Sequence, residues 1–232
     1  MHCAHGDHLM DWSALNLSFR LALWTLILLL PLGLILGRWL AWSPIKGRSL
    51  IQALLALPLV LPPTVLGFYL LSVFSVSSTT GGLYQQLTGR SLAFSFEGLL
   101  IASLIFNIPF AVQPIQRAFE TISRDVLDAA ACCGLSRWQQ FRIIELPLIW
   151  PGILGAAVLV FAHTLGEFGV VLMVGGNIPD ETQTIAISIY DSVQSFDNKS
   201  ASVMSAVLLL ISLCAISLVF YLSGTRKSTG IV

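Results

Sequence analysis

Long runs of residues without a charged side chain divide this sequence, and they limit the folds that are open to it. Residues 21–37 lie between Arg20 and Arg38 and are mostly apolar. An α-helix needs about 20 such residues to cross the hydrocarbon core of a bilayer. Further runs of this kind cover residues 50–74, 98–116, 148–175 (interrupted only by Glu167) and 200–225. The runs predict an all-α integral membrane protein, a bundle of five or six transmembrane helices.

The composition agrees with lipid as the solvent. Only 10% of the 232 residues are charged, whereas soluble domains carry about 25%. We expect a single transmembrane domain over residues 1–232, and the formal net charge of zero argues against a nucleic-acid partner. The first run has no Lys or Arg before Arg20, so we expect a retained helix rather than a signal peptide. A metal-like spacing occurs in His2, Cys3, His5 and His8, but termini are commonly disordered and we expect no metal site.

The distribution of basic residues predicts the orientation. If residues 117–147 are cytoplasmic, alternation of the spans places nine of the 12 basic residues on the cytoplasmic side. These are Arg38, Lys46, Arg48, Arg117, Arg124, Arg137, Arg142, Arg226 and Lys227. Cytoplasmic segments carry such an excess. We therefore expect the N-terminus outside and the C-terminus in the cytoplasm. Residues 76–96 would form an outer aqueous loop, and 176–199 an outer turn and short helix.

The segment 117–147 has a helix–turn–helix pattern. An apolar stripe of Ile122, Val126, Ala129, Ala130 and Cys133 predicts the first helix. Gly134 suits a left-handed helix end, and Ser136 with Gln139 forms a capping-box pattern for the second helix. Trp138, Phe141 and Ile144 share a face of that helix, which we expect to end at Pro147. By periodicity alone, such a pair could also lie on the bilayer surface.

The detailed spacing resembles the EAA loop of binding-protein-dependent ABC importers. That pattern is Glu-Ala-Ala, three residues, glycine, nine residues and Ile-x-Leu-Pro, and here Asp128 replaces the first glutamate. The resemblance implies that residues 129–134 dock in a groove of an ATP-hydrolysing subunit. The residues that it assigns to ATPase coupling are Asp128, Ala129, Ala130, Gly134, Leu146 and Pro147. The chain has no phosphate-binding loop, so ATP and magnesium are expected on the partner, and the chain itself is expected to bind no cofactor and to be no enzyme.

Residues 57–71 and 164–190 are similar to the molybdate permeases of bacteria, most distinctively at 166–169 and 176–179. The resemblance implies a type I importer permease that moves molybdate by alternating access in the bacterial inner membrane. It also implies a homodimer, two cytoplasmic ATP-binding subunits and an external oxyanion-binding protein. Tungstate and sulfate or thiosulfate permeases share parts of these patterns and are alternatives. An ion channel or secondary carrier is an alternative of another class, although neither needs a coupling helix. A membrane enzyme would need catalytic motifs that the sequence lacks.

Glu167 is an acidic residue within the mostly apolar run of residues 148–175. A continuous helix from Pro147 would place it about 30 Å further along, near the outer boundary. His163 lies one turn earlier, so the two side chains could pair. Ionisable groups at such depth are functional candidates. We consider a gate or a docking contact for the external binding protein, and also a simple helix anchor.

Further pathway candidates are helix-disturbing or polar residues inside the spans. Pro62 and Pro63 interrupt the second run beside Thr64, and Asn107 lies in the third. Prolines in spans are tolerated where neighbours or a water-filled cavity satisfy the freed carbonyls. A kink that lines the pathway and a kink that only serves packing are both consistent with this pattern.

Overall fold

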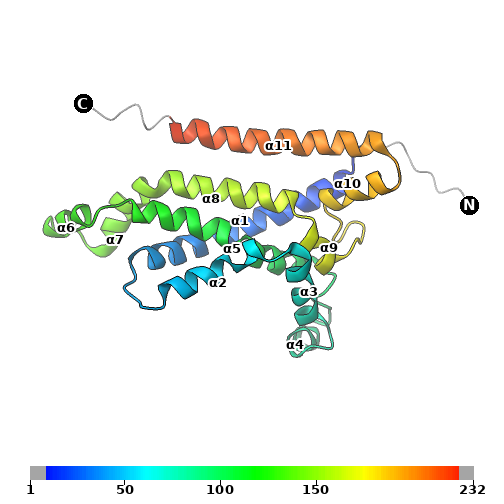
Figure 1. Ribbon diagram of the computed structural model, residues 1–232, viewed down its shortest axis with the longest axis horizontal. Coiled ribbons are helices and arrows are strands. Elements are labelled where there is room, and N and C mark those ends of the chain that lie inside the picture. Colours follow the sequence, from blue (N-terminus) through cyan, green and yellow to red (C-terminus); the bar gives the residue numbers. More distant parts are fainter. Residues whose placement is uncertain (1–8, 225–232) are drawn as a thin grey trace, which may run out of the picture.

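The computed structural model describes residues 9–224, and all regular structure in that range is helical (Figure 1). Three long helices pack against one another: α1 (Trp12–Trp42), α5 (Phe96–Glu120) and α8 (Leu146–Gly166). A fourth, α11 (Asn198–Gly224), lies along α8. Within residues 9–224, four helices are long and apolar enough to cross a membrane. The predicted all-α membrane fold is confirmed.

The second predicted span is a broken helix rather than a kinked one. It consists of α2 (Arg48–Val60) and α3 (Pro63–Phe74), bent by 105° relative to each other, and as a pair it would make a fifth crossing. Leu61 and Pro62 are extended, with ψ of 136° and 134°. A proline disfavours helical backbone in the residue before it, so Pro62 and Pro63 extend Leu61 and Pro62 in turn.

The fourth predicted span also breaks. α8 ends at Gly166, Glu167 has extended backbone, and the short helix α9 (Gly169–Gly175) follows. The expectation of a continuous helix through Glu167 is therefore wrong. The two segments that were predicted to lie outside contain α4 (Thr79–Thr88), where only a loop was expected, and the expected short helix, α10 (Ile185–Gln194).

The two ends of the bundle differ in what they carry (Figure 1). The α1–α2 connection lies at one end with α6 (Arg124–Cys132), α7 (Arg137–Gln140) and a π-helical turn, η1 (Phe141–Glu145). We call this the coupling end. Helices α4 and α10 lie toward the opposite end. This arrangement agrees with the predicted alternation of the spans, because both short segments of the 117–147 region share an end with the α1–α2 connection.

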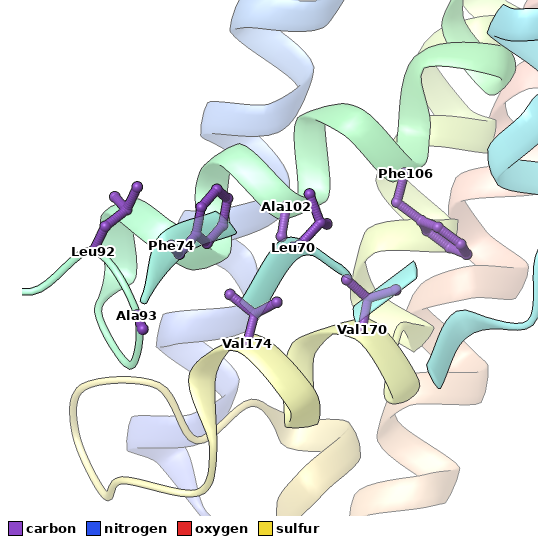
Figure 2. Packing of buried hydrophobic residues seen from close by; sticks show 8 residues of the cluster. All are labelled: Leu70, Phe74, Leu92, Ala93, Ala102, Phe106, Val170 and Val174. Carbon is purple, nitrogen blue, oxygen red and sulfur yellow. The ribbon is translucent and has the colours of Figure 1, made fainter. Parts of the chain in front are cut away.

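Apolar side chains join α3, α5 and α9 into one packed unit (Figure 2). Its buried members are Leu70, Phe74, Leu92, Ala93, Ala102, Phe106, Val170 and Val174. Neither α3 nor α9 is long enough to cross a bilayer alone, and their packing on α5 fixes their positions. The broken segments are thereby held on a long, continuous helix.

Close packing of α5 on α8 depends on Gly152. A Cβ atom at this position would lie 2.4 Å from the Ala118 Cβ, whereas at Gly155, on the same helix, it would meet nothing within 4 Å. We expect Gly152→Val to destabilise the bundle by about 1–3 kcal/mol, because overpacking forces the two helices apart. Gly155→Val is the matched control, since it has the same effect on helix propensity. Thermal unfolding in detergent should separate the two variants, and equal melting temperatures would contradict this account.

Candidate functional site

The coupling segment, residues 124–145, begins with a helix that ends in a Schellman motif. The Gly134 amide donates to the Ala131 carbonyl at 2.9 Å, and the Leu135 amide donates to the Ala130 carbonyl at 3.2 Å. Gly134 has a φ of 79°, which glycine adopts without the penalty of a Cβ atom. The predicted glycine turn is confirmed, and it reverses the chain between α6 and α7.

The second helix of the segment starts as the sequence predicts. Ser136 and Gln139 form the capping box, in which the Ser136 amide donates to Gln139 Oε1 at 2.8 Å. The predicted end at Pro147 is wrong, because α7, η1 and α8 form one continuous helical segment from Arg137 to Gly166. In η1 the Leu146 amide donates to the Phe141 carbonyl, five residues back. This wider turn lies just before Pro147. It shifts the backbone hydrogen-bond pattern at the place where the proline ring would otherwise clash with the carbonyl four residues back.

The predicted apolar stripe is only partly covered, and its first residue, Ile122, lies before α6 rather than in it. Ile122 and Ala130 are buried, whereas Val126 is 43% exposed and Ala129 and Cys133 are exposed. Asp128 is exposed as well. Exposed small residues allow another backbone to approach closely, so this face of α6 could receive a partner. Leu146 packs on the cluster of Ile115, Phe119 and Ile149, which anchors the segment to the bundle.

A bidentate ion pair at the coupling end is one that sequence analysis missed. Arg38 at the end of α1 forms a bidentate pair with Glu145, with Nε–Oε2 at 2.7 Å and Nη2–Oε1 at 3.0 Å. The Glu145 side chain is 2% exposed and that of Arg38 39%. The Arg38 guanidinium also lies over the rings of Trp42 and Phe141.

This pair ties α1 to the π turn that ends the coupling segment, directly before α8. Bidentate arginine–carboxylate contacts are geometrically specific, so they restrict how η1 can move relative to α1. The sequence does contain a signal for this ion pair. Glu145 is the only acidic residue between Asp128 and Glu167, and it stands at the start of an apolar run. An acidic residue there requires a cation, and Arg38 ends the first run.

The two helix breaks adjoin each other. A Cβ atom on Gly169 would lie 2.7 Å from the Pro63 Cβ, and one on Gly67 would lie 2.7 Å from the Met173 Cβ. The start of α9 therefore lies directly against the start of α3. Pro62, Pro63 and Thr64 are exposed at this junction. Discontinuous helices that meet in this way form the substrate sites of many transporters, because they free backbone groups inside the membrane.

Glu167 and His163 do not pair, contrary to the expectation from their spacing. Glu167 Oε1 accepts from the Val170 amide at 2.9 Å, so the carboxylate caps the start of α9. The His163 ring lies between Phe106 and Phe110, with centroid distances of 4.9 and 4.1 Å. The break after Gly166 is the physical reason, because the spacing rule for side-chain pairs applies only to a continuous helix.

Asn107 lies in the interior of the bundle rather than at the junction of the breaks. It is fully buried and donates to the Ser103 carbonyl at 2.9 Å. Ser103 Oγ lies 2.9 Å from Thr25 Oγ1 on α1. These contacts form a buried polar connection between α1 and α5.

Residues 9–224 contain no group of three metal-ligating side chains that could hold an ion. The His2, Cys3, His5 and His8 cluster lies outside the described residues, as do Arg226 and Lys227.

Residues 30–226 match the family described as binding-protein-dependent transport system inner membrane component. The chain belongs to this family. The matched range includes the coupling segment and both helix breaks, so the features described above are parts of a transport permease. It is a multi-pass membrane subunit.

Individual relatives narrow the comparison. The chain is 42% identical over 217 residues to the molybdenum transport system permease protein ModB of Azotobacter vinelandii, covering 94% of this chain and 95% of that protein. It is 34% identical to the ModB protein of Escherichia coli K12, over 88% and 90% of the two chains. The chain is also 34% identical to the sulfate transport system permease protein CysT of Salmonella typhimurium, in an alignment that covers 77% of this chain and 66% of that protein.

The fold has counterparts among solved structures. A bacterial alginate ABC transporter, in complex with an alginate-bound periplasmic protein, contains a chain that superimposes with a TM-score of 0.73. The alignment covers 94% of this chain and 80% of that chain at 18% identity. The type I importer permease fold predicted from the sequence is confirmed.

Proposed function

We propose that this chain is the membrane-spanning permease subunit of an ATP-driven, binding-protein-dependent importer of molybdate. The observation that carries the proposal is the coupling segment. In this segment the chain reverses at Gly134 after an exposed helix of small residues, and Glu145 joins the segment to α1. The similarity to two ModB proteins along nearly the full chain supports molybdate as the substrate. Tungstate, as a tetrahedral oxyanion, and sulfate are the alternatives that the test must separate.

The proposed mechanism is alternating access, in which the chain changes shape and another subunit hydrolyses ATP. Asp128, Ala129, Ala130 and Gly134 would contact the ATPase, while Leu146 and Pro147 transmit the movement into α8. When the two ATPases close on ATP, the paired coupling segments would approach each other and open the pathway outward. The pathway would pass the adjoining helix breaks near Thr64 and Glu167. This chain contributes a conformational equilibrium rather than bond-making chemistry.

The proposed assembly contains two copies of this chain, two cytoplasmic ATP-binding subunits and an external oxyanion-binding protein. Exposed apolar side chains on α2 and α3, among them Leu54, Leu57 and Phe68, suit contact with a second copy and with lipid. ATP and magnesium would bind to the partner subunits. The coupling end would face the cytoplasm of a bacterial cell, with the N-terminus outside, as the distribution of basic residues favours.

The proposal is tested by ATP hydrolysis in liposomes that contain this chain, its ATPase and its binding protein. Stimulation by the molybdate-loaded binding protein, but not by the sulfate-loaded form, is the expected result. Stimulation by sulfate or by tungstate alone would reassign the substrate. Failure of this chain to co-purify with an ATPase would overturn the importer assignment.

Substitutions at Glu167 distinguish a gate from a helix cap. Because Gln also presents a side-chain oxygen to the Val170 amide, we expect Glu167→Gln to keep more than half of the uptake rate. Glu167→Leu removes the cap and should lower uptake at least fivefold at equal membrane content. Uptake of radioactive molybdate by cells measures both. Equal loss in the two variants would show instead that the ionised carboxylate itself is required.

A further inference from the structure

A cavity of about 450 Å³, with an apolar wall and a polar wall, lies between α1, α2 and α5 at the coupling end. Its apolar wall is formed by side chains such as Leu40, Leu55 and Val112. Its polar wall is formed by Gln52, Gln113, Gln116, Arg117 and Glu120. The volume falls in the range of small-molecule sites, which combine an apolar lining with a few convergent polar groups.

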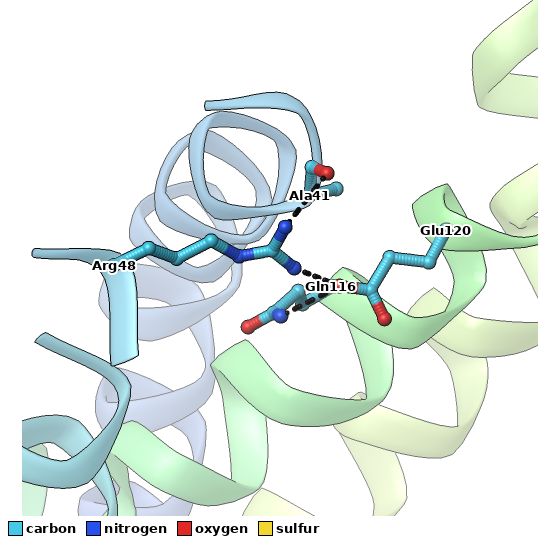
Figure 3. Close-up of polar contacts among 4 residues, drawn as sticks. All are labelled: Ala41, Arg48, Gln116 and Glu120. Carbon is cyan, nitrogen blue, oxygen red and sulfur yellow. Dashed lines mark hydrogen bonds and ion pairs between the residues drawn. The ribbon is translucent and has the colours of Figure 1, made fainter. Parts of the chain in front are cut away.

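The carboxylate in this cavity is already neutralised (Figure 3). Glu120 Oε1 accepts from Arg48 Nη2 and from Gln116 Nε2, the latter at 2.9 Å. The Arg48 guanidinium also reaches the Ala41 carbonyl at 3.4 Å. A carboxylate held by two donors repels an approaching anion much less than a bare one would.

The remaining donors of the cavity are free. In the part of the chain that the structure describes, the side chains of Gln52, Gln113 and Arg117 make no hydrogen bond or ion pair. Together with Arg48, Arg117 outweighs the single charge of Glu120 and leaves a net charge of +1 around the cavity. Amide and guanidinium N–H groups are donors, and an oxyanion is an acceptor on every face.

We propose that this cavity is a low-affinity exit site for a tetrahedral oxyanion, bound by the N–H groups of Gln52, Gln113 and Arg117. The inference rests on the proposed function and gives it a location at the cytoplasmic side of the pathway. The position suits an exit, because Glu120 is the last residue of α5 and α6 begins at Arg124. The coupling segment therefore begins within a few residues of the cavity, so a movement of this segment would reach the site directly.

The test uses protection of a cysteine in the cavity. Ala53 lines the cavity and offers no donor, so Ala53→Cys is introduced into a chain whose four cysteines are replaced by serine. The assembled transporter in nanodiscs, without nucleotide, is labelled with a charged maleimide. We expect molybdate to slow the labelling at least threefold relative to chloride at equal ionic strength. A chain that carries only Lys46→Cys, at an exposed position of the α1–α2 connection that does not line the cavity, is the control and should label at an unchanged rate.

Two further variants separate binding from a general effect on structure. Arg117→Gln in the Ala53→Cys chain should remove most of the protection by taking away the charge, and Gln113→Leu should weaken it. Arg90→Gln, at an exposed arginine that follows α4 and does not line the cavity, should leave it intact.

The outcomes also separate the exit site from the proposed function. Molybdate uptake by the wild-type transporter without any protection at Ala53→Cys would overturn the exit site and leave the importer standing. Protection that persists in Arg117→Gln would overturn the assigned donors. Absence of uptake by the wild-type transporter would overturn the proposed function itself.

Discussion

Replacing Gly134 with proline should abolish ATP-dependent uptake, reducing it at least 100-fold, while the protein still inserts in the membrane. Proline fixes φ near −65°, whereas Gly134 has a φ of 79°, and proline also removes the amide that donates to the Ala131 carbonyl. The chain could then no longer reverse after α6, and the exposed face of this helix would turn away from its partner. Uptake is measured as radioactive oxyanion in cells, at equal permease content in the membrane fraction.

A conservative replacement at the same position provides the control. Asparagine tolerates the left-handed conformation better than most residues that carry a Cβ atom, and a Cβ atom at Gly134 meets nothing within 4 Å. Gly134→Asn should therefore keep much of the uptake, whereas Gly134→Val should fall between the two. Normal uptake by a well-expressed Gly134→Pro variant would contradict the coupling role of the segment.

The second large effect is expected from Arg38. Arg38→Leu leaves the Glu145 carboxylate buried without a partner, which should cost about 3–5 kcal/mol of stability. The loss should appear as a lower melting temperature in detergent and as less permease in the membrane. The variant should lose uptake as well, since η1 is no longer fixed to α1.

The double variant Arg38→Leu with Glu145→Leu tests the cause. Replacing both charges by apolar groups removes the unpaired carboxylate, and such replacements are often neutral or stabilising. We expect the melting temperature to recover while uptake remains impaired, because the geometric link between α1 and η1 is gone. If the single and double variants unfold at the same temperature, the pair is not the source of the effect.

Sequence analysis succeeded where a short pattern determines a local structure. The apolar runs predict the long helices, because a bilayer leaves few other ways to satisfy the backbone. Gly134, Ser136 and Gln139 predict the turn and the cap, because each acts through neighbours within a few residues. These features depend on residues that are close in the sequence.

The features that sequence analysis missed depend on residues that are far apart. The contact between Arg38 and Glu145 joins positions separated by 107 residues, and the cavity beside Gln113 needs α2 to be placed on α5. The break at Glu167 was missed for another reason. Its carboxylate was interpreted as a charge within a continuous helix, whereas it caps a new one. Neither periodicity nor charge distinguishes these two roles.

The π turn at residues 141–145 has a consequence for the direction of the forces between subunits. A π turn is equivalent to one residue inserted into an α-helix, so it rotates everything before it by about 100° relative to everything after it. It therefore sets the rotation about the helix axis between Trp138 on α7 and the buried face of α8 that carries Ile149. If the inserted residue were deleted, Trp138 would lie about a quarter turn further round the helix axis. In the proposed mechanism, the torque that the coupling segment applies to α8 thus depends on one residue of helical phase.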